Sequence, residues 1–229
     1  MAEQETARRP RRIRVWDLPT RLFHWLLVAL VATSVYTGWT GGLTEMDIHM
    51  VSGQLILCLV GFRVLWGFVG SRHARFSSFL RGPAAIRGYL RDARAGRGWS
   101  AGHNPLGALS VVAMLVVLAV QGSTGLFAND DIFTEGPLAA KVSKDTSDLL
   151  TFVHHLAADA LLILLVLHLL AVFGYLIVKK DNLIMPMLSG RKDLPDGVEA
   201  ADEPFVGLVR ALAVAAIVGS IYWGLAAWL

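Results

Sequence analysis

The stretch Val153–Phe173, VHHLAADALLILLVLHLLAVF, constrains the fold of this chain more than any other segment. Apolar runs of this length span membranes as helices. The run carries His154 near one end and His168 well inside it. On an α-helix this spacing is about 21 Å along the axis, with both side chains within about 40° of one face. Ionisable side chains inside a membrane are costly and rare, so the pair is a candidate functional site.

The residue that follows His154 is also a histidine. On a helix, His155 points about 140° away from the face of His168, so we treat it as the lesser candidate. A histidine that is simply hydrogen-bonded inside a helix bundle is the alternative interpretation for any one of these side chains. That alternative is weaker for two histidines on one face of a helix that is otherwise so apolar.

The composition is that of a polytopic membrane protein. Of the 229 residues, 55% are hydrophobic, and the mean hydropathy is +0.54. The N-terminus is basic, but a full-length apolar segment follows it, so we expect no cleaved signal peptide. Cys58 is the only cysteine. Disulfides within the chain, cysteine-ligated clusters and covalently attached haem are therefore excluded.

Hydrophobicity predicts an all-α integral membrane protein with five spans. The predicted ranges are 19–39, 48–69, 104–127, 149–178 and 204–229. Asp17 is a possible N-cap of the first span, which Gly41 and Gly42 end, and Asn104 with Pro105 signals the start of the third. We expect a basic segment over 1–18, a four-helix bundle over 19–192, a polar linker over 193–203 and an additional helix over 204–229.

The loops differ strongly in their content of basic residues, and this difference predicts the orientation. Residues 1–18 carry five arginines and loop 71–103 carries seven, whereas residues 40–47 have no lysine or arginine. The positive-inside rule places the N-terminus and loop 71–103 in the cytoplasm. Five spans leave the C-terminus outside, where Trp223 and Trp228 would lie at the membrane interface.

The basic loop contains one segment with a pattern of its own. Residues 83–93, PAAIRGYLRDA, alternate apolar and basic side chains. This pattern is typical of a short interfacial helix on the cytoplasmic face, and a plain basic loop is the alternative. The same loop contains His73 and His103, which we expect to be solvated.

The orientation gives each remaining histidine a depth in the membrane. The fourth span runs inward, so His154 lies near the outer surface and His168 towards the inner one. The first span runs outward from His24, and the second runs inward from His49. His24 therefore matches His168 in depth, and His49 matches His154. We call these the inner pair and the outer pair.

Two pairs of imidazoles at two depths suit haem better than a simple metal site. Zinc or copper brings three or four ligands to one point, within about 2 Å of the metal. Haem iron takes four ligands from the porphyrin and needs two axial ligands from the protein. We therefore expect two non-covalently held b haems, one on each pair. With both axial positions filled, electron transfer is favoured over oxygen binding.

Two further residues of the second span fit such a bundle. Gly53 is one turn after His49, and a glycine there leaves room for a flat macrocycle; close helix packing is the alternative. Arg63 is fourteen residues after His49, so it falls near the depth of the inner pair. A buried arginine needs an anionic partner, and a haem propionate is one. Snorkelling of Arg63 to the inner interface is the alternative.

These motifs together resemble the bacterial dihaem membrane cytochromes of the cytochrome b561 type, which include the b-type subunits of nickel–iron hydrogenases. The resemblance covers about residues 14–192 and is carried by RLFHWLL with His24, HMVSGQLILCLVGFRVLWGFVGSRHARF with His49, GHNPLG, STGLF, and VHH followed by His168. It implies two b haems with His24, His49, His154 and His168 as axial ligands. The position after His154, often acidic in relatives, is His155 here.

The resemblance also implies a partnership. It implies that electrons pass between the membrane quinone pool and a periplasmic redox partner, such as a c-type cytochrome or a membrane-associated oxidoreductase like hydrogenase. Acidic outer loops would suit a basic partner: residues 128–148 hold five carboxylates and two lysines, a net charge of −3. Glu45 and Asp47 add to this surface. Loops that merely follow the positive-inside bias are the alternative.

Other functions remain open at the level of sequence. A histidine-lined proton or metal transporter would need acidic partners, and Asp159 is the only clear carboxylate in the fourth span. An assembly or anchoring subunit would carry no cofactor. A superoxide-type oxidase would react directly at the outer haem and would need no protein partner. Whether the chain is itself an enzyme therefore stays undecided from the sequence.

Overall fold

The computed structural model describes residues 12–94, 99–195, 198 and 200–226. Three features predicted from the sequence lie partly outside these residues. Arg8, Arg9 and Arg11 of the basic segment, Arg97 of the basic loop, and Trp228 are not among the described residues.

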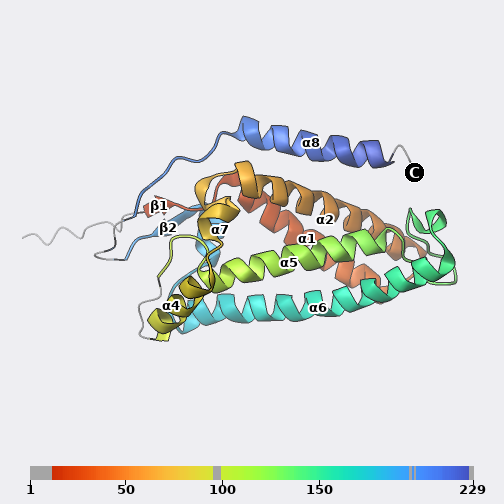
Figure 1. The fold of residues 1–229 in the computed structure, drawn as a ribbon, viewed down its shortest axis with the longest axis horizontal. Helices are drawn as coiled ribbons and strands as arrows, with labels where there is room; N and C mark the ends of the chain where they lie inside the picture. Colours follow the sequence, from red (N-terminus) through yellow and green to blue (C-terminus); the bar gives the residue numbers. More distant parts are fainter. Residues whose placement is uncertain (1–11, 95–98, 196–197, 199, 227–229) are drawn as a thin grey trace, which may run out of the picture.

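Four long helices form a bundle, as the hydrophobicity predicts (Figure 1). They are α1 (Leu18–Thr40), α2 (Leu43–Val69), α5 (Pro105–Gly125) and α6 (Lys144–Ile177). Each is long and apolar enough to cross a membrane. Helices α2 and α6 begin about five residues earlier than predicted, because their first turns are polar and extend beyond the apolar stretch that marks a span.

The helix ends follow local signals in the sequence. The Asp17 side chain accepts a hydrogen bond from Thr20 N at 2.9 Å, and Asn104 accepts one from Gly107 N at 2.8 Å. These side chains satisfy amides that have no partner within the helix. Gly41 and Gly42 have φ values of 65° and 96°, a backbone that glycine adopts without strain, and so α1 turns sharply into α2.

The centre of the bundle is a layer of packed aliphatic and aromatic side chains. Its buried members are Phe23, Val31, Ile56, Val60, Leu115, Leu118 and Leu161. Large apolar side chains also cover the outside of the bundle; Leu167 and Leu170 of α6 are 56% and 64% exposed. Apolar surface on this scale is what a membrane-embedded bundle presents to lipid.

Short elements gather at one end of the bundle, which we call the basic end (Figure 1). They are η1 (Arg72–Ala74), α3 (Phe76–Phe79), α4 (Pro83–Arg94), α7 (Ile184–Ser189), and the strands β1 (Arg12–Arg14) and β2 (Arg191–Asp193). The strands pair antiparallel, with Ile13 opposite Lys192. Helix α4 matches the predicted interfacial helix. The opposite end, the acidic end, carries the loop between α5 and α6 with η2 (Ala139–Lys141).

The additional C-terminal helix is also present. Helix α8 (Leu208–Ala226) lies along the outside of α2 (Figure 1). Near one end Arg210 Nη1 donates to Val69 O at 3.2 Å, and near the other Tyr222 donates to Gln54 Oε1 at 2.6 Å. These contacts at both ends fix α8 against a single neighbour, so it adds to the four-helix bundle without entering its centre.

Candidate functional site

The outer pair comes together near the acidic end of the bundle. The rings of His49 from α2 and His154 from α6 lie with their centroids 6.1 Å apart and their planes at 81°. His155 is exposed and its ring lies 6.2 Å from that of His154. The structure therefore turns His154, and not its neighbour, towards His49.

Each ring of the outer pair is held by a backbone carbonyl. His49 Nδ1 lies 2.9 Å from Ser34 O, and His154 Nδ1 lies 2.9 Å from Gln121 O. A carbonyl can only accept, so both Nδ1 atoms carry the proton and both Nε2 atoms keep a lone pair. This is the arrangement that orients a histidine for metal ligation.

The side chain of Gln121 is hydrogen-bonded to the His154 Nε2 lone pair, at which a metal would bind. The Gln121 amide nitrogen lies 3.1 Å from His154 Nε2 and donates to it. The other end of the amide, Gln121 Oε1, is buried without a hydrogen-bond partner. A half-satisfied buried amide is poorly held, so its displacement by iron at Nε2 would cost little.

Glycines of the neighbouring helices allow these rings to approach closely. A Cβ atom on Gly38 would lie 3.0 Å from His49 Cε1, and one on Gly125 would lie 2.9 Å from His154 Cε1. Gly53 is different, because nothing lies within 4 Å of a Cβ built there. Its face is open space, as a flat group beside His49 would require, and close helix packing does not explain this glycine.

The inner pair lies towards the basic end. His24 from α1 and His168 from α6 are close enough to interact electrostatically, and both are half-buried. His24 packs edge-on against Trp25 at 5.0 Å. Its Nδ1 is buried without a hydrogen-bond partner. Three helices, α1, α2 and α6, thus supply all four histidines, as the sequence predicts.

Arg63 is buried in α2, with only 2% of its surface exposed. Its guanidinium lies over the rings of Phe76 and Phe79, at 5.1 Å and 6.0 Å from their centroids. Both Nη atoms are buried without a hydrogen-bond partner. Snorkelling to the surface is therefore not what Arg63 does. A buried guanidinium without acceptors is unfavourable unless an anion completes the site, so this position suits a carboxylate.

His103 and His73 are both half-buried, so the expectation that they would be solvated loop residues is only partly met. The His103 ring lies between Trp16 and Phe79, with centroid distances of 4.6 Å and 4.7 Å. Its Nδ1 is buried without a partner. His73 lies so close to Gly102 that a Cβ there would come within 2.9 Å of His73 Nδ1. Partners from distant segments cover part of both side chains, which the composition of their own loop does not reveal.

This burial changes the protonation of the two histidines. Burial lowers the pKa of His103 to about 3, and the positive charge of Arg63 adds to the effect. Burial also lowers the pKa of His73, with a contribution from Arg72. A cavity of about 230 Å³ lies against the two rings. A neutral His103 therefore lies within electrostatic reach of Arg63.

Asp17 is a residue whose second role the sequence does not show. It is only 1% exposed, and it interacts electrostatically with Arg63. Trp66 Nε1 also donates to it at 3.2 Å. The position of Asp17 directly before a helix indicates only that it is an N-cap. The Trp66 and Arg63 contacts arise only when α1 and α2 pack together.

Comparison with known proteins gives consistent matches along most of the chain. The profile of the family described as prokaryotic cytochrome b561 matches residues 15–190. A "Probable Ni/Fe-hydrogenase B-type cytochrome subunit" of Azotobacter vinelandii is 28% identical, over 84% of this chain and 95% of the relative. The protein of the same description from Rhizobium leguminosarum bv. viciae is 24% identical, over 85% of this chain and 95% of the relative.

No solved structure gives a significant match. The family profile nevertheless spans the whole four-helix bundle and both histidine pairs. This chain therefore belongs to the prokaryotic cytochrome b561 family, multi-pass bacterial membrane proteins that carry b-type haem and take part in electron transfer.

Proposed function

We propose that this chain is a dihaem b-type cytochrome that passes electrons between a redox partner on the outer side of the membrane and the membrane quinone pool. The geometry of the outer pair carries the proposal. His49 and His154 face each other from two helices, and each Nδ1 proton is held by a backbone carbonyl. The inner pair adds two further imidazoles, from α1 and α6, that are close enough to interact electrostatically.

The four histidines have equivalent roles in this proposal. His49 and His154 hold the outer iron, and His24 and His168 hold the inner iron. Haem, when bound, supplies reversible one-electron transfer at its iron. With His49 and His154 at one iron and His24 and His168 at the other, the chain would leave small molecules no open coordination site, which favours electron transfer over oxygen chemistry.

Two residues of α2 complete the cofactor sites. Arg63 offers both unpartnered Nη atoms to a propionate of the inner haem, and a charge-assisted bond to a carboxylate would offset the cost of its burial. Gly53 keeps the space beside the outer pair clear of side-chain atoms. Neither residue exchanges electrons. Arg63 would neutralise the charge of the propionate, and Gly53 would leave room for the macrocycle.

The distribution of charge supports the orientation and the domain limits that we propose. The arginines of the basic end face the cytoplasm, and the acidic end faces the periplasm, in accordance with the positive-inside rule. The N-terminus is then cytoplasmic and the C-terminus periplasmic, in the bacterial inner membrane. Residues 1–18 form a basic segment, 19–192 the dihaem domain, 193–203 a linker and 204–229 an added transmembrane helix.

The relatives indicate which partner to test first. They are described as hydrogenase subunits, so a membrane-associated oxidoreductase such as hydrogenase is the first candidate. A periplasmic c-type cytochrome is the second. Quinone would exchange electrons with the chain within the membrane.

A count of haem in the purified chain tests the proposal. A pyridine haemochrome assay should give about two b haems per chain, with low-spin ferric signals from both irons. A histidine-lined transporter would show no haem bands in a reduced-minus-oxidised spectrum. A content near one haem, or a high-spin signal from most of the iron, would contradict the paired arrangement.

A further inference from the structure

Helix α4 lies at the basic end with two different faces. Ile86, Tyr89 and Ala93 are partly buried on one side, whereas the arginines Arg87, Arg91 and Arg94 are exposed on another. The burial pattern thus separates apolar from basic side chains along one short helix, as in helices that lie in the plane of a membrane surface.

The helix is fixed at the depth where the membrane spans end. The Tyr89 hydroxyl is hydrogen-bonded to the hydroxyl of Tyr175, which lies in the last turn of α6. Asn104, the N-cap of α5, donates to the same Tyr175 hydroxyl at 2.9 Å. Helix α4 is therefore held beside the ends of two spans, where lipid headgroups lie around a membrane protein.

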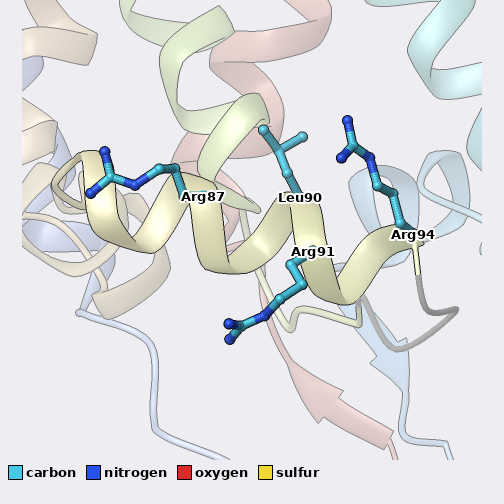
Figure 2. Close-up of a pocket in the computed structure, with 4 residues that line it drawn as sticks. All are labelled: Arg87, Leu90, Arg91 and Arg94. Atoms are coloured by element: carbon cyan, nitrogen blue, oxygen red, sulfur yellow. The ribbon is translucent and has the colours of Figure 1, made fainter.

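A shallow, open space lies along the exposed side of α4. Arg87, Leu90, Arg91 and Arg94 line this space of about 430 Å³. Figure 2 shows Leu90 between Arg87 and Arg94, with Arg91 projecting in a different direction. Among the residues that the structure describes, Arg87 and Arg94 have no hydrogen-bond or ion-pair partner, and Arg91 Nε lies 4.0 Å from Asp92 Oδ1. Two of the three guanidinium groups are thus available to an anion.

We propose that this face of α4 binds an anionic phospholipid, with the phosphate among the arginines and Leu90 against the glycerol and the start of an acyl chain. Guanidinium groups present paired donors that match phosphate oxygens. Clusters of basic residues beside a membrane span attract anionic lipid. This inference concerns the lipid environment of the chain and goes beyond its electron transfer.

Leu90 distinguishes a lipid from a free phosphate ion. A soluble anion would be bound best by polar groups alone, but here an apolar side chain that is 37% exposed separates two of the arginines. A phospholipid has both parts, a phosphate and an apolar chain, in that order from the surface inward. The position of α4 beside the span ends places its arginines at the level of phosphates that are already present.

The experiment uses the full, haem-loaded chain in detergent and titrates phosphatidylglycerol or phosphatidylcholine, with bound lipid counted by native mass spectrometry. Wild type should retain phosphatidylglycerol in preference to phosphatidylcholine. The variant R87Q/R91Q/R94Q should bind phosphatidylglycerol about 25-fold more weakly, since each of the two available guanidinium groups contributes about fivefold. A single Arg87→Gln change should lower the affinity about fivefold and serves if the triple variant is unstable.

The matched control removes equal charge from the same end of the molecule. In R75Q/R81Q/K180Q, three exposed basic residues outside α4 are neutralised, and phosphatidylglycerol binding should stay close to that of wild type. An unchanged haem spectrum reports that each variant is folded. Equal losses in both triple variants, or equal retention of the two lipids, would overturn the proposal. Displacement of phosphatidylglycerol by inorganic phosphate would also overturn it, in favour of a site for free phosphate.

Discussion

Trp66 Nε1 donates a hydrogen bond to Asp17 Oδ2 at 3.2 Å, and this bond ties the start of α1 to the end of α2. Both side chains are almost completely buried. The other carboxylate oxygen accepts from Thr20 N and caps α1. Arg63, one turn before Trp66 on α2, interacts with the same carboxylate electrostatically. One buried carboxylate therefore caps a helix, joins two spans and partly offsets the charge of Arg63.

Replacement of Asp17 should destabilise the chain in two separable steps. Asp17→Ala removes the cap, at about 1 kcal/mol, and leaves the buried Trp66 N–H without an acceptor, at about 1–3 kcal/mol more. Asp17→Ser restores a capping oxygen and should recover the first part only. Thermal unfolding in detergent measures both changes. If Asp17→Ala and wild type have the same unfolding temperature, the buried carboxylate has no stabilising role.

Removal of single histidines should remove single haems. If His154 is one of two ligands of the outer haem, as we propose, His154→Ala should lower the haem content from about two to about one per chain with the inner haem kept. His168→Ala should have the reverse effect. A redox titration of each variant distinguishes the two cases by which of two potential components is lost.

The control for these variants is the neighbouring residue. His155 is exposed and does not face His49, so His155→Ala should keep both haems. Loss of the outer haem in His155→Ala, together with its retention in His154→Ala, would reverse our assignment of the outer ligand.

The close approach of Gly125 to His154 gives a more local test. A Cβ at this position would lie 2.9 Å from His154 Cε1, so Gly125→Ala should displace the imidazole and lower the outer-haem content or shift its midpoint potential. Gly174→Ala, in α6, places a methyl group where nothing lies within 4 Å. This control should leave both haems unchanged and favour the helix by about 0.5–1 kcal/mol. Identical outer-haem spectra in the two variants would show that Gly125 does not position the ring.

The parts of this structure that the sequence predicts are those that depend on local patterns. Apolar runs mark the four long spans and α8, and Asp17 and Asn104 mark helix starts, because a cap and its amide lie three residues apart. The depth matching of the histidines needs only the span order and the positive-inside rule. Both kinds of inference use patterns that can be read along the sequence, without contacts between distant segments.

The remaining parts depend on contacts between distant segments. Strands β1 and β2 pair across nearly the whole chain, and no turn signal connects them. The position of the His103 ring depends on contacts with Trp16 and Phe79, which come from two other segments. A loop rich in arginine indicates exposure to solvent, and only the packed structure shows that both of its histidines are half-buried.

The buried position of His103 predicts a dependence of stability on pH. Burial lowers its pKa from 6.5 to about 3. Since the folded state binds this proton less readily than the unfolded state, His103 stabilises the fold fully above about pH 6.5, and this contribution is lost as the pH falls towards 3. His103→Phe, which keeps a ring between Trp16 and Phe79, should therefore reduce the loss of stability between about pH 6.5 and pH 5. Unfolding midpoints of both proteins at several pH values provide the measurement, and parallel declines would contradict the assignment.

The acidic loop between α5 and α6 uses several of its carboxylates internally. Asp130 accepts hydrogen bonds from the backbone amides of Ile132, Phe133 and Thr134, and these bonds lower its pKa to about 2. Lys144 is paired with Asp131 at 2.5 Å and also with Asp148. These residues order the loop, so their substitution would alter its shape as well as its charge.

Docking of a basic partner is better tested at carboxylates without such structural bonds. Asp47 and Glu135 are exposed at the acidic end, and among the described residues neither side chain has an ion-pair partner. Charged rims mainly raise the association rate, and salt screens them. In stopped-flow electron transfer with a basic c-type cytochrome, D47N/E135Q should lower the bimolecular rate several-fold at low salt and weaken its dependence on ionic strength. Asp193→Asn, at the basic end, should leave the rate unchanged. A rate indifferent to both salt and D47N/E135Q would remove electrostatic docking at these loops and leave the paired haem sites untouched.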